Sequence, residues 1–339
     1  MESSRNPYNI LILCSGRRVE LVQCFQRAAR KLGIKSMIIA GDCDPTAPTL
    51  YFADKVCMLP RIDSPNYVDS IIHGCLDNDV ALIVPTIDTD LLLLAKNKET
   101  IEKVTKAKIL ISDFKAIEVC RDKIKTQRYL EANGFNVPHM YTEKELENGD
   151  PKYPLFIKPK DGSSSIQAFK VNDGDELTIY RRLIKNPIVQ DYMEGEEYTV
   201  DAFLDFNVNI ITLVPRLRMA TRCGEISKGK IVKDQEIIAE VKRLLAVLKP
   251  IGQITVQCMK TKKGVEFIEI NPRFGGGAPM SIASGADSCE NLYRLLMGEE
   301  LTYNEAYTDN LVFLRFDSSI CLGADGQVMG LDDHEEVER

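Results

Sequence analysis

Short apolar runs alternate with amphipathic stretches through the first third of the chain, and this alternation limits the folds it can adopt. The apolar runs cover residues 8–14, 36–42 and 80–85. Residues 21–33, between the first two runs, have helical spacing of apolar residues and end at Gly33, a typical helix stop. Strands that alternate with helices form parallel sheets with helices on their faces. The sequence therefore predicts an amino-terminal α/β unit.

Length, charge and cysteine usage narrow the class of protein. The chain has 339 residues, too many for one typical core, and a net charge of −7 at pH 7. This charge gives no general attraction to nucleic acid or to anionic membranes, so we expect neither as a partner. The 10 cysteines are scattered singly without a CxxC pair, and no apolar run approaches the ~20 residues that span a bilayer. These features predict a cytoplasmic protein with reduced thiols.

The strand ends of the amino-terminal unit carry polar residues. In open α/β sheets, ligands bind at the carboxyl ends of the strands. The loop after the first strand lacks the GxGxxG fingerprint, which disfavours a dinucleotide-dependent oxidoreductase. Helix caps and surface charges are the alternative interpretation of these polar residues. The candidate neighbours of a shared cleft are Ser15, Arg17, Asp42, Thr86 and Asp88.

From about residue 115 the pattern changes to strands and helices that are segregated, as in α+β units. One helix is predicted across 114–133, before Gly134, and another across 234–248. Strands are predicted around 252–260 and 265–272. We therefore divide the chain into an α/β domain over 1–114, an α+β domain over 115–322 and a flexible tail over 323–339. The α+β domain has two predicted subdomains, at about 115–190 and 191–322.

The segment FIEINPRFGGG, residues 267–277, carries the densest chemistry. Glu269, Asn271 and Arg273 occupy alternate positions of a strand-like run, so their side chains are predicted on one face. Mg²⁺ takes hard oxygen ligands from one or two side chains together with phosphates, and an arginine holds an anion in a bidentate fork. The motif predicts a site for a metal-bound phosphate.

A second motif, FIKPKDGSSSIQ, places Lys158 at the end of a strand before a loop of small residues that includes Ser163 and Ser164. Such a loop exposes backbone N–H groups that can close on phosphate oxygens, while the lysine supplies a positive charge. The Walker pattern GxxxxGK[ST] is absent, so this is not a P-loop. A plain β-hairpin loop is the alternative interpretation.

Further nucleotide-site candidates follow in chain order. Lys123 opens a predicted helix and can reach a phosphate. Residues Gln190, Asp191, Tyr192 and Met193 follow a strand whose backbone can bind an adenine edge, and Glu197 can accept hydrogen bonds from ribose hydroxyls. Each of these residues alone is better explained as a solvated charge or a turn, and it is their order along the chain that favours a nucleotide site.

With these motifs in order, the chain resembles the ATP-grasp family, and most closely its single-copy members that are similar to half of the carbamoyl phosphate synthase large subunit. The resemblance runs from the opening NILILCSGRRVEL to FLRFDSS near residue 319. It implies an N-terminal pre-ATP-grasp parallel-sheet domain and two α+β subdomains that clamp ATP with Mg²⁺ or Mn²⁺.

The resemblance also assigns residue roles. Lys123 and Lys158 match phosphate ligands, residues 190–193 the adenine hinge, and Glu197 the ribose carboxylate. Gln257, Glu269 and Asn271 match the metal ligands, and Arg273 matches the residue that steadies the transferring phosphoryl group. Many family members carry an acidic residue at the position of Gln257, whereas carbamoyl phosphate synthase carries glutamine there.

The resemblance implies an ATP-dependent carboxylate–amine ligase that works through an acyl phosphate. A full carbamoyl phosphate synthase needs a second ATP-grasp half, and this chain has one. Arg216, Arg218 and Arg222 lie where related proteins bind the acceptor substrate; arginines suit a carboxylate or phosphate, and a solvated basic loop is the alternative. An ATP-binding accessory subunit without chemistry is the second function considered. The acid and the amine stay open, and a homodimer is the default expectation.

Overall fold

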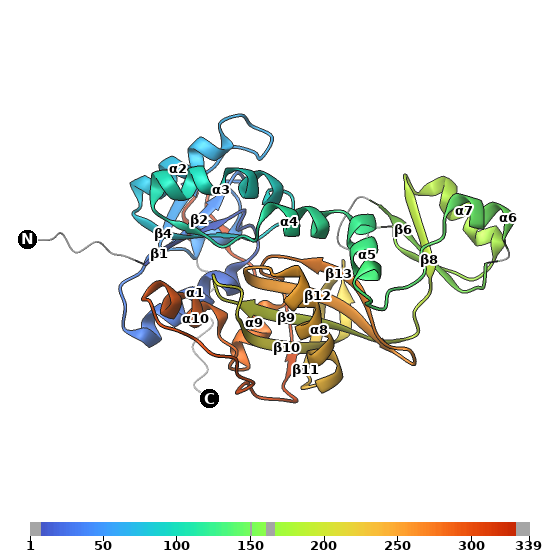
Figure 1. Cartoon of the computed structure of the whole chain (residues 1–339). Coiled ribbons are helices and arrows are strands. Elements are labelled where there is room, and N and C mark those ends of the chain that lie inside the picture. Colours follow the sequence, from blue (N-terminus) through green and yellow to red (C-terminus); the bar gives the residue numbers. More distant parts are fainter. Residues whose placement is uncertain (1–7, 150, 161–166, 330–339) are drawn as a thin grey trace, which may run out of the picture.

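The computed structural model describes residues 8–149, 151–160 and 167–329. Figure 1 shows a main body, which begins with β1, and a smaller lobe that stands apart from it, built around β6 (Leu155–Pro159) and β8 (Pro187–Asp191). In the described part of the chain, no helix combines the length and the apolar character needed to cross a membrane.

The amino-terminal unit is the predicted parallel sheet, with strand order β3-β2-β1-β4-β5. Residues of β1 alternate between two cores. Ile10 and Ile12 pack with the core under α1, whereas Leu11 and Leu13 pack with the core under α2 and α3. The elements are β1 (Asn9–Leu13), α1 (Val19–Leu32), β2 (Ile38–Asp42), the 3₁₀ helix η1 (Pro48–Tyr51), β3 (Lys55–Met58), α2 (Tyr67–Asp77), β4 (Val80–Pro85), α3 (Leu91–Thr105) and β5 (Lys108–Ile109). Gly33 ends α1 in the left-handed conformation, as predicted.

The buried face of α1 is covered by helices from the far end of the chain. These are α9 (Ala278–Ala283) and α10 (Ser288–Leu296). The Phe25 ring packs edge-on against Phe274 and Tyr293, with centroids 6.0 and 6.1 Å away. Phe274 and Tyr293, from the last quarter of the chain, are thus part of the hydrophobic core of the amino-terminal unit.

The helix predicted across 114–133 is wrong as a single element. The structure has two helices, α4 (Phe114–Arg121) and α5 (Lys123–Ala132), separated at Asp122. Asp122 is extended, and its carboxylate accepts hydrogen bonds from the N–H groups of Ile124 and Lys125. This is an N-cap, and it starts a new helix because it satisfies donors that have no partner inside α5.

The smaller lobe is a three-stranded antiparallel sheet, in the order β7-β6-β8, with two helices. Its core is formed by buried aliphatic side chains such as Leu155, Ile157 and Val189. The elements are α6 (Glu143–Asn148), β6 (Leu155–Pro159), β7 (Phe169–Val171), α7 (Gly174–Leu183) and β8 (Pro187–Asp191).

The large sheet has the order β13-β12-β9-β10-β11-β14 and is antiparallel throughout. Buried residues of α8, among them Val241 and Leu244, pack on one face of it. The elements are β9 (Gly195–Leu204), β10 (Ile210–Arg222), β11 (Glu225–Ile231), α8 (Gln235–Leu248), β12 (Gly252–Thr261), β13 (Gly264–Asn271) and β14 (Val312–Leu314). The strands predicted around 252–260 and 265–272 are confirmed, and the second ends at Asn271, one residue before the predicted end.

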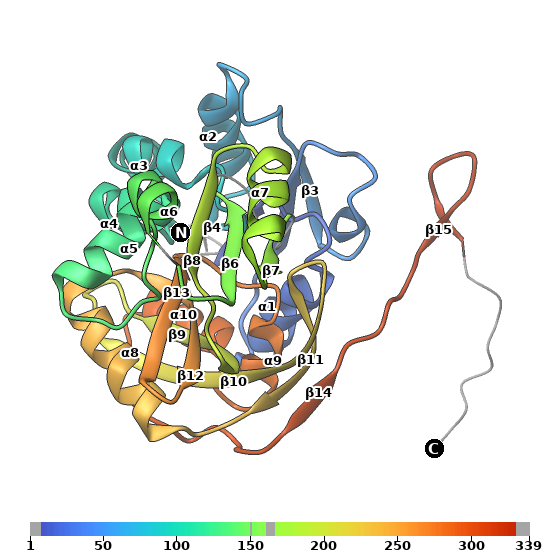
Figure 2. The ribbon, with the colours of Figure 1, turned by 90° about the vertical axis from the view of Figure 1, so that its right-hand side faces the viewer.

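After β14 the chain leaves the body and forms a two-stranded hairpin, β15 (Cys321–Leu322) with β16 (Val328–Met329). Figure 2 shows this hairpin well away from the rest of the molecule. The tail predicted over 323–339 begins inside the hairpin, and residues 330–339 lie outside the described part.

Candidate active site

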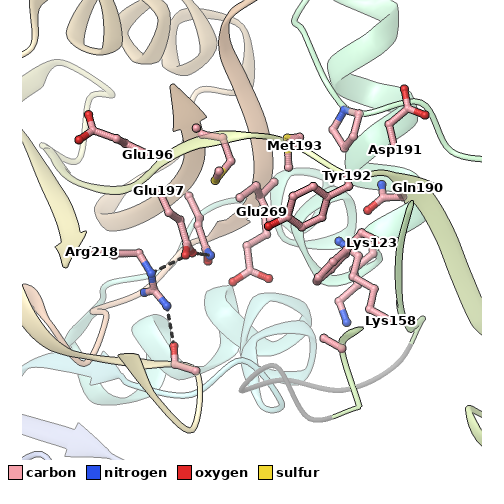
Figure 3. A pocket seen from close by; sticks show the side chains of 18 of the residues that line it. Lys123, Lys158, Gln190, Asp191, Tyr192, Met193, Glu196, Glu197, Arg218 and Glu269 are labelled. Atoms are coloured by element: carbon pink, nitrogen blue, oxygen red, sulfur yellow. Dashed lines mark hydrogen bonds and ion pairs between the residues drawn. The ribbon is translucent and has the colours of Figure 1, made fainter. Parts of the chain in front are cut away.

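A cavity of about 650 Å³ lies between the small sheet and the large sheet. The small lobe contributes Lys158 from β6 and the segment after β8, and the large sheet contributes side chains of β9, β10, β12 and β13. Figure 3 shows Glu269 between the two lysines on one side and Glu197 with Arg218 on the other. Basic and acidic groups therefore face each other across one cavity.

The basic wall holds Lys123 and Lys158. Lys123 is the first residue of α5, and its Nζ donates a hydrogen bond to the carbonyl of Pro159 at 3.0 Å. Burial lowers the pKa of Lys158 to about 8, and nearby Lys123 adds to this effect while Glu269 opposes it. Two ammonium groups close together in a partly desolvated wall favour an anionic ligand. Ser163 and Ser164 lie outside the described residues.

The segment 190–193 links the two lobes along the rim of the cavity. Gln190 is buried, and its amide donates to Gln127 at 2.5 Å, so the side chain is already bonded within the protein. Asp191 accepts from the Tyr141 hydroxyl at 2.9 Å. Among the described residues, the N–H of Met193 has no hydrogen-bond acceptor. The backbone at Met193 is therefore the available edge-binding group of this segment.

Glu197, on β9, is held from two sides. Arg218 Nε lies 2.8 Å from its Oε1, and the Gln257 amide donates to the same oxygen. Arg218 also donates to the Gly224 carbonyl at 2.9 Å. Arg218 thus lines the cavity beside Glu197, the residue predicted for the ribose.

Glu269 and Asn271 lie on β13, with the Asn271 amide donating to Glu269 Oε1 at 2.9 Å. Among the described residues, no group of three His, Cys, Asp or Glu side chains is arranged to hold a metal ion. One carboxylate with the amide oxygens of Asn271 and Gln257 is a hard-oxygen donor set, and it fits Mg²⁺ that arrives already bound to phosphates.

Arg273 follows the end of β13, and its partners lie outside this cavity. Its guanidinium pairs with Asp88, after β4, at 2.6 Å, and it does not line the cavity. The strand ends at Asn271, so the alternation that places Glu269 and Asn271 does not extend to Arg273. Arg273 instead ties the large sheet to the amino-terminal domain.

Of the three arginines predicted to bind the substrate, Arg216 and Arg222 do not line the cavity. Arg216 is buried and pairs with Asp201 at 3.1 Å, and the Ser281 hydroxyl donates to the same carboxylate. Arg222 is exposed and pairs with Asp317 at 2.6 Å. Of the three, Arg218 alone lines the cavity.

Three of the predicted cleft residues at the strand ends bond within the fold. The Ser15 hydroxyl pairs with Thr49 at 2.7 Å, Thr86 donates to the Leu13 carbonyl, and Asp42 accepts from the Gly16 N–H. Asp88 is also bonded within the fold, to Arg273. Sequence reasoning also missed the apolar part of the cavity, because single apolar residues in strands carry no distinguishing signal; these are Phe156, Leu217, Met219, Met259 and Ile268.

Comparison with known proteins bears on this geometry. Residues 10–109 match the family described as the PylC-like N-terminal domain, and residues 120–277 match the ATP-grasp domain. The chain contains an ATP-grasp domain. The second match spans both sheets that border the cavity, from α5 to the glycine-rich segment after β13.

Several relatives of this ATP-grasp protein span most of it. A carbamoyl-phosphate synthase of Methanobrevibacter smithii is 24% identical over 80% of this chain and 76% of that protein. A 3-methyl-D-ornithine–L-lysine ligase of Methanosarcina mazei is 26% identical over 82% of this chain and 70% of that protein. The biotin carboxylase domain of a Hydrogenobacter thermophilus 2-oxoglutarate carboxylase, solved with MgADP and bicarbonate, shares the fold with a TM-score of 0.68 at 18% identity, over 90% of this chain and 73% of that one.

Proposed function

We propose that this ATP-grasp protein is an ATP-dependent carboxylate–amine ligase that binds Mg-ATP between its small and large sheets. The observation that carries the proposal is the cavity itself. Two lysines on the small-lobe side face Glu269 and Glu197 on the large sheet, and the matched ATP-grasp region spans both walls. The names of the carbamoyl-phosphate synthase and lysine-ligase relatives support the reaction class.

The same proposal gives each candidate residue a role in binding Mg-ATP. Lys123 and Lys158, with the loop of Ser163 and Ser164, hold the phosphates. The backbone from Gln190 to Met193 binds the adenine edge, and Glu197 accepts from the ribose hydroxyls. Metal contacts come from Gln257, Glu269 and Asn271. Arg273 pairs with Asp88 in this structure, and its role in orienting the transferring phosphoryl group rests on the resemblance alone.

The reaction has two displacements. A carboxylate oxygen of the acid attacks the γ-phosphorus and the bond to the β,γ-bridging oxygen breaks, giving an acyl phosphate and ADP. The amine then attacks the acyl carbon, phosphate leaves, and the amine loses a proton. Lys158 and Lys123 align the phosphates and neutralise charge. When bound, Mg²⁺ supplies charge neutralisation at the phosphates.

The proposal extends to the substrates, the oligomeric state and the cellular location. The acid and the amine are small molecules, and we propose a homodimer that works in the cytoplasm. The net charge of −7 supports the absence of nucleic acid and anionic membrane partners.

The test is ADP release from Mg-ATP with a panel of carboxylates, and hydroxylamine present to trap acyl phosphate as a hydroxamate. We expect one acid to raise ADP release and Glu269→Gln to reduce turnover by ~10²-fold or more, with the melting temperature unchanged. Glu299→Gln, an exposed carboxylate after α10, is the matched control. Near-normal turnover in Glu269→Gln would contradict the metal assignment. Tight ATP binding without turnover for any acid would favour the accessory subunit.

A further inference from the structure

A cluster of charged side chains lies where the amino-terminal domain meets the large sheet. It is built by the start of α1, the loop after β4, the segment after β13, the start of β11 and the residue after β14. The first turn of α1 is joined to the residue after β14 through Glu20 and Arg315, which are 3.8 Å apart. The members are Arg18, Glu20, Asp88, Glu225, Arg273 and Arg315.

All but one of the arginines in this cluster have a carboxylate partner. Arg273 pairs with Asp88 at 2.6 Å, and Arg315 pairs with Glu225 at 3.4 Å as well as with Glu20. Among the described residues, no acceptor or carboxylate is bonded to the Arg18 side chain, and it makes no capping bond to α1. Arg18 is therefore the one arginine of the cluster without a bonded carboxylate in the described part of the chain.

The surroundings of Arg18 make its charge unfavourable. The side chain is partly buried, and burial with the nearby charge of Arg273 lowers its pKa to about 10. The other charges that face it are Asp88 and Glu225, which attract it, and Arg315, which repels it. A cation that is desolvated without a partner is costly, and an anion placed beside it removes that cost.

The cluster lies next to the part of the cavity that carries Glu197 and Glu269. Arg273 follows Glu269 by four residues, and Glu225 follows Gly224, which lines the cavity and accepts from Arg218. The glycine-rich segment passes close by, since a Cβ at Gly276 would lie 3.0 Å from Glu225 Oε1. The cluster that contains Arg18 is thus joined to the cavity wall through Glu225 and the segment after β13.

We propose that Arg18 binds the carboxylate of the acid substrate, in an anion site completed by Arg273 and Arg315. This inference rests on the proposed ligase function and adds a specificity residue from the amino-terminal domain. A planar guanidinium grips a carboxylate in a bidentate fork, which a lysine cannot reproduce. The substrate class is a small carboxylic acid that binds as its anion.

The kinetic test compares Arg18→Met, Arg18→Lys and the control Arg30→Met, an exposed arginine at the other end of α1. We expect Arg18→Met to raise the KM of the acid by about 10- to 100-fold, because the variant loses charge-assisted hydrogen bonds to the carboxylate. The KM of ATP should change by less than about twofold. Arg18→Lys should recover part of the loss, and Arg30→Met should match the parent chain. An unchanged KM of the acid in Arg18→Met would overturn the proposal.

A second measurement does not depend on turnover. The full chain is labelled with phenylglyoxal, and modification of each arginine is read by peptide mass mapping with and without millimolar succinate. We expect succinate to protect Arg18 and leave Arg30 unprotected, in the parent chain and in Glu269→Gln alike. Protection without turnover for any acid would refute the ligase function and leave the anion site standing. Turnover without protection of Arg18 would refute the anion site alone.

Discussion

At the residue scale, Lys158 shows how burial sets the working range of a side chain. It ends a strand of the small lobe, and burial there lowers its pKa from 10.5 to about 8. A lysine must be protonated to hold phosphate, and the nearby Lys123 makes protonation harder. A bound anion would raise the pKa of Lys158, as Glu269 already does in part. The free and ligand-bound proteins therefore differ in proton affinity at this lysine.

This shift predicts a pH dependence of nucleotide binding. The pKa of Lys158 is about 8 in the folded chain and 10.5 in the unfolded chain. Below pH 8 the buried lysine therefore lowers the free energy of unfolding. As the pH rises from 8 to 10.5, the folded chain gives up this proton first and the free energy of unfolding increases again. ATP needs the protonated form, so its affinity should fall by up to about tenfold per pH unit above 8. Dissociation constants of ATP at three pH values from neutral to 9, for the parent chain and Lys158→Met, measure this. Equal slopes in both proteins would contradict the assignment.

Strand periodicity predicted the placement of Glu269, whereas Glu197 was chosen by its distance along the chain and Gln257 by the resemblance. The structure brings the three together because β9, β12 and β13 are neighbouring strands, and their roles stay predictions. Sequence reasoning was less informative for the arginines. Neighbours on one face of β10, Arg216 and Arg218, differ in partner because Arg216 meets the buried Asp201 and Arg218 meets Glu197. Such partners come from distant segments, which one sequence does not reveal.

At the scale of elements, the break between α4 and α5 decides where Lys123 points. Helical periodicity continues across residues 114–133, so pattern alone predicted one helix. The competing signal was local, because Asp122 offers a carboxylate to the first N–H groups of a new helix. The cap places Lys123 at a helix start, directed toward the carbonyl of Pro159 and the cavity.

Removing this cap should therefore affect both stability and binding. Asp122→Ala is expected to lower the free energy of unfolding by about 1 kcal/mol and to raise the KM of ATP, because α5 loses the bonds that fix its first turn. Asp122→Asn keeps a good cap and serves as the control. Urea titration and ADP-release kinetics give the two readouts. A stable Asp122→Ala protein with unchanged ATP kinetics would show that α5 is positioned by its packing alone.

At the scale of the molecule, the family boundaries and the packing boundaries do not coincide. The amino-terminal match ends at residue 109, yet the core around α1 includes Phe274 and Tyr293. The parallel sheet was predictable from its apolar runs. Its cover by α9 and α10 was not, because their apolar residues carry no sign of a partner so far away in the chain.

The amino-terminal domain should accordingly not fold alone. A fragment of residues 1–114 leaves the face of α1 around Phe25 exposed, since the rings that cover it come from beyond residue 270. We expect the fragment to bind the dye ANS and to lack a cooperative thermal transition, whereas the whole chain melts cooperatively. Cooperative melting of the fragment without dye binding would show that the parallel sheet is self-sufficient.

The salt bridge from Lys31 to Glu290 joins residues 259 positions apart, on helices that pack against each other. During synthesis α1 leaves the ribosome long before α10 exists. At ~5–20 residues per second that interval lasts roughly 13–50 s, during which the part of α1 that packs against α10 lacks its native cover. The nascent chain then exposes apolar surface around Phe25, where aggregation or chaperone binding can begin.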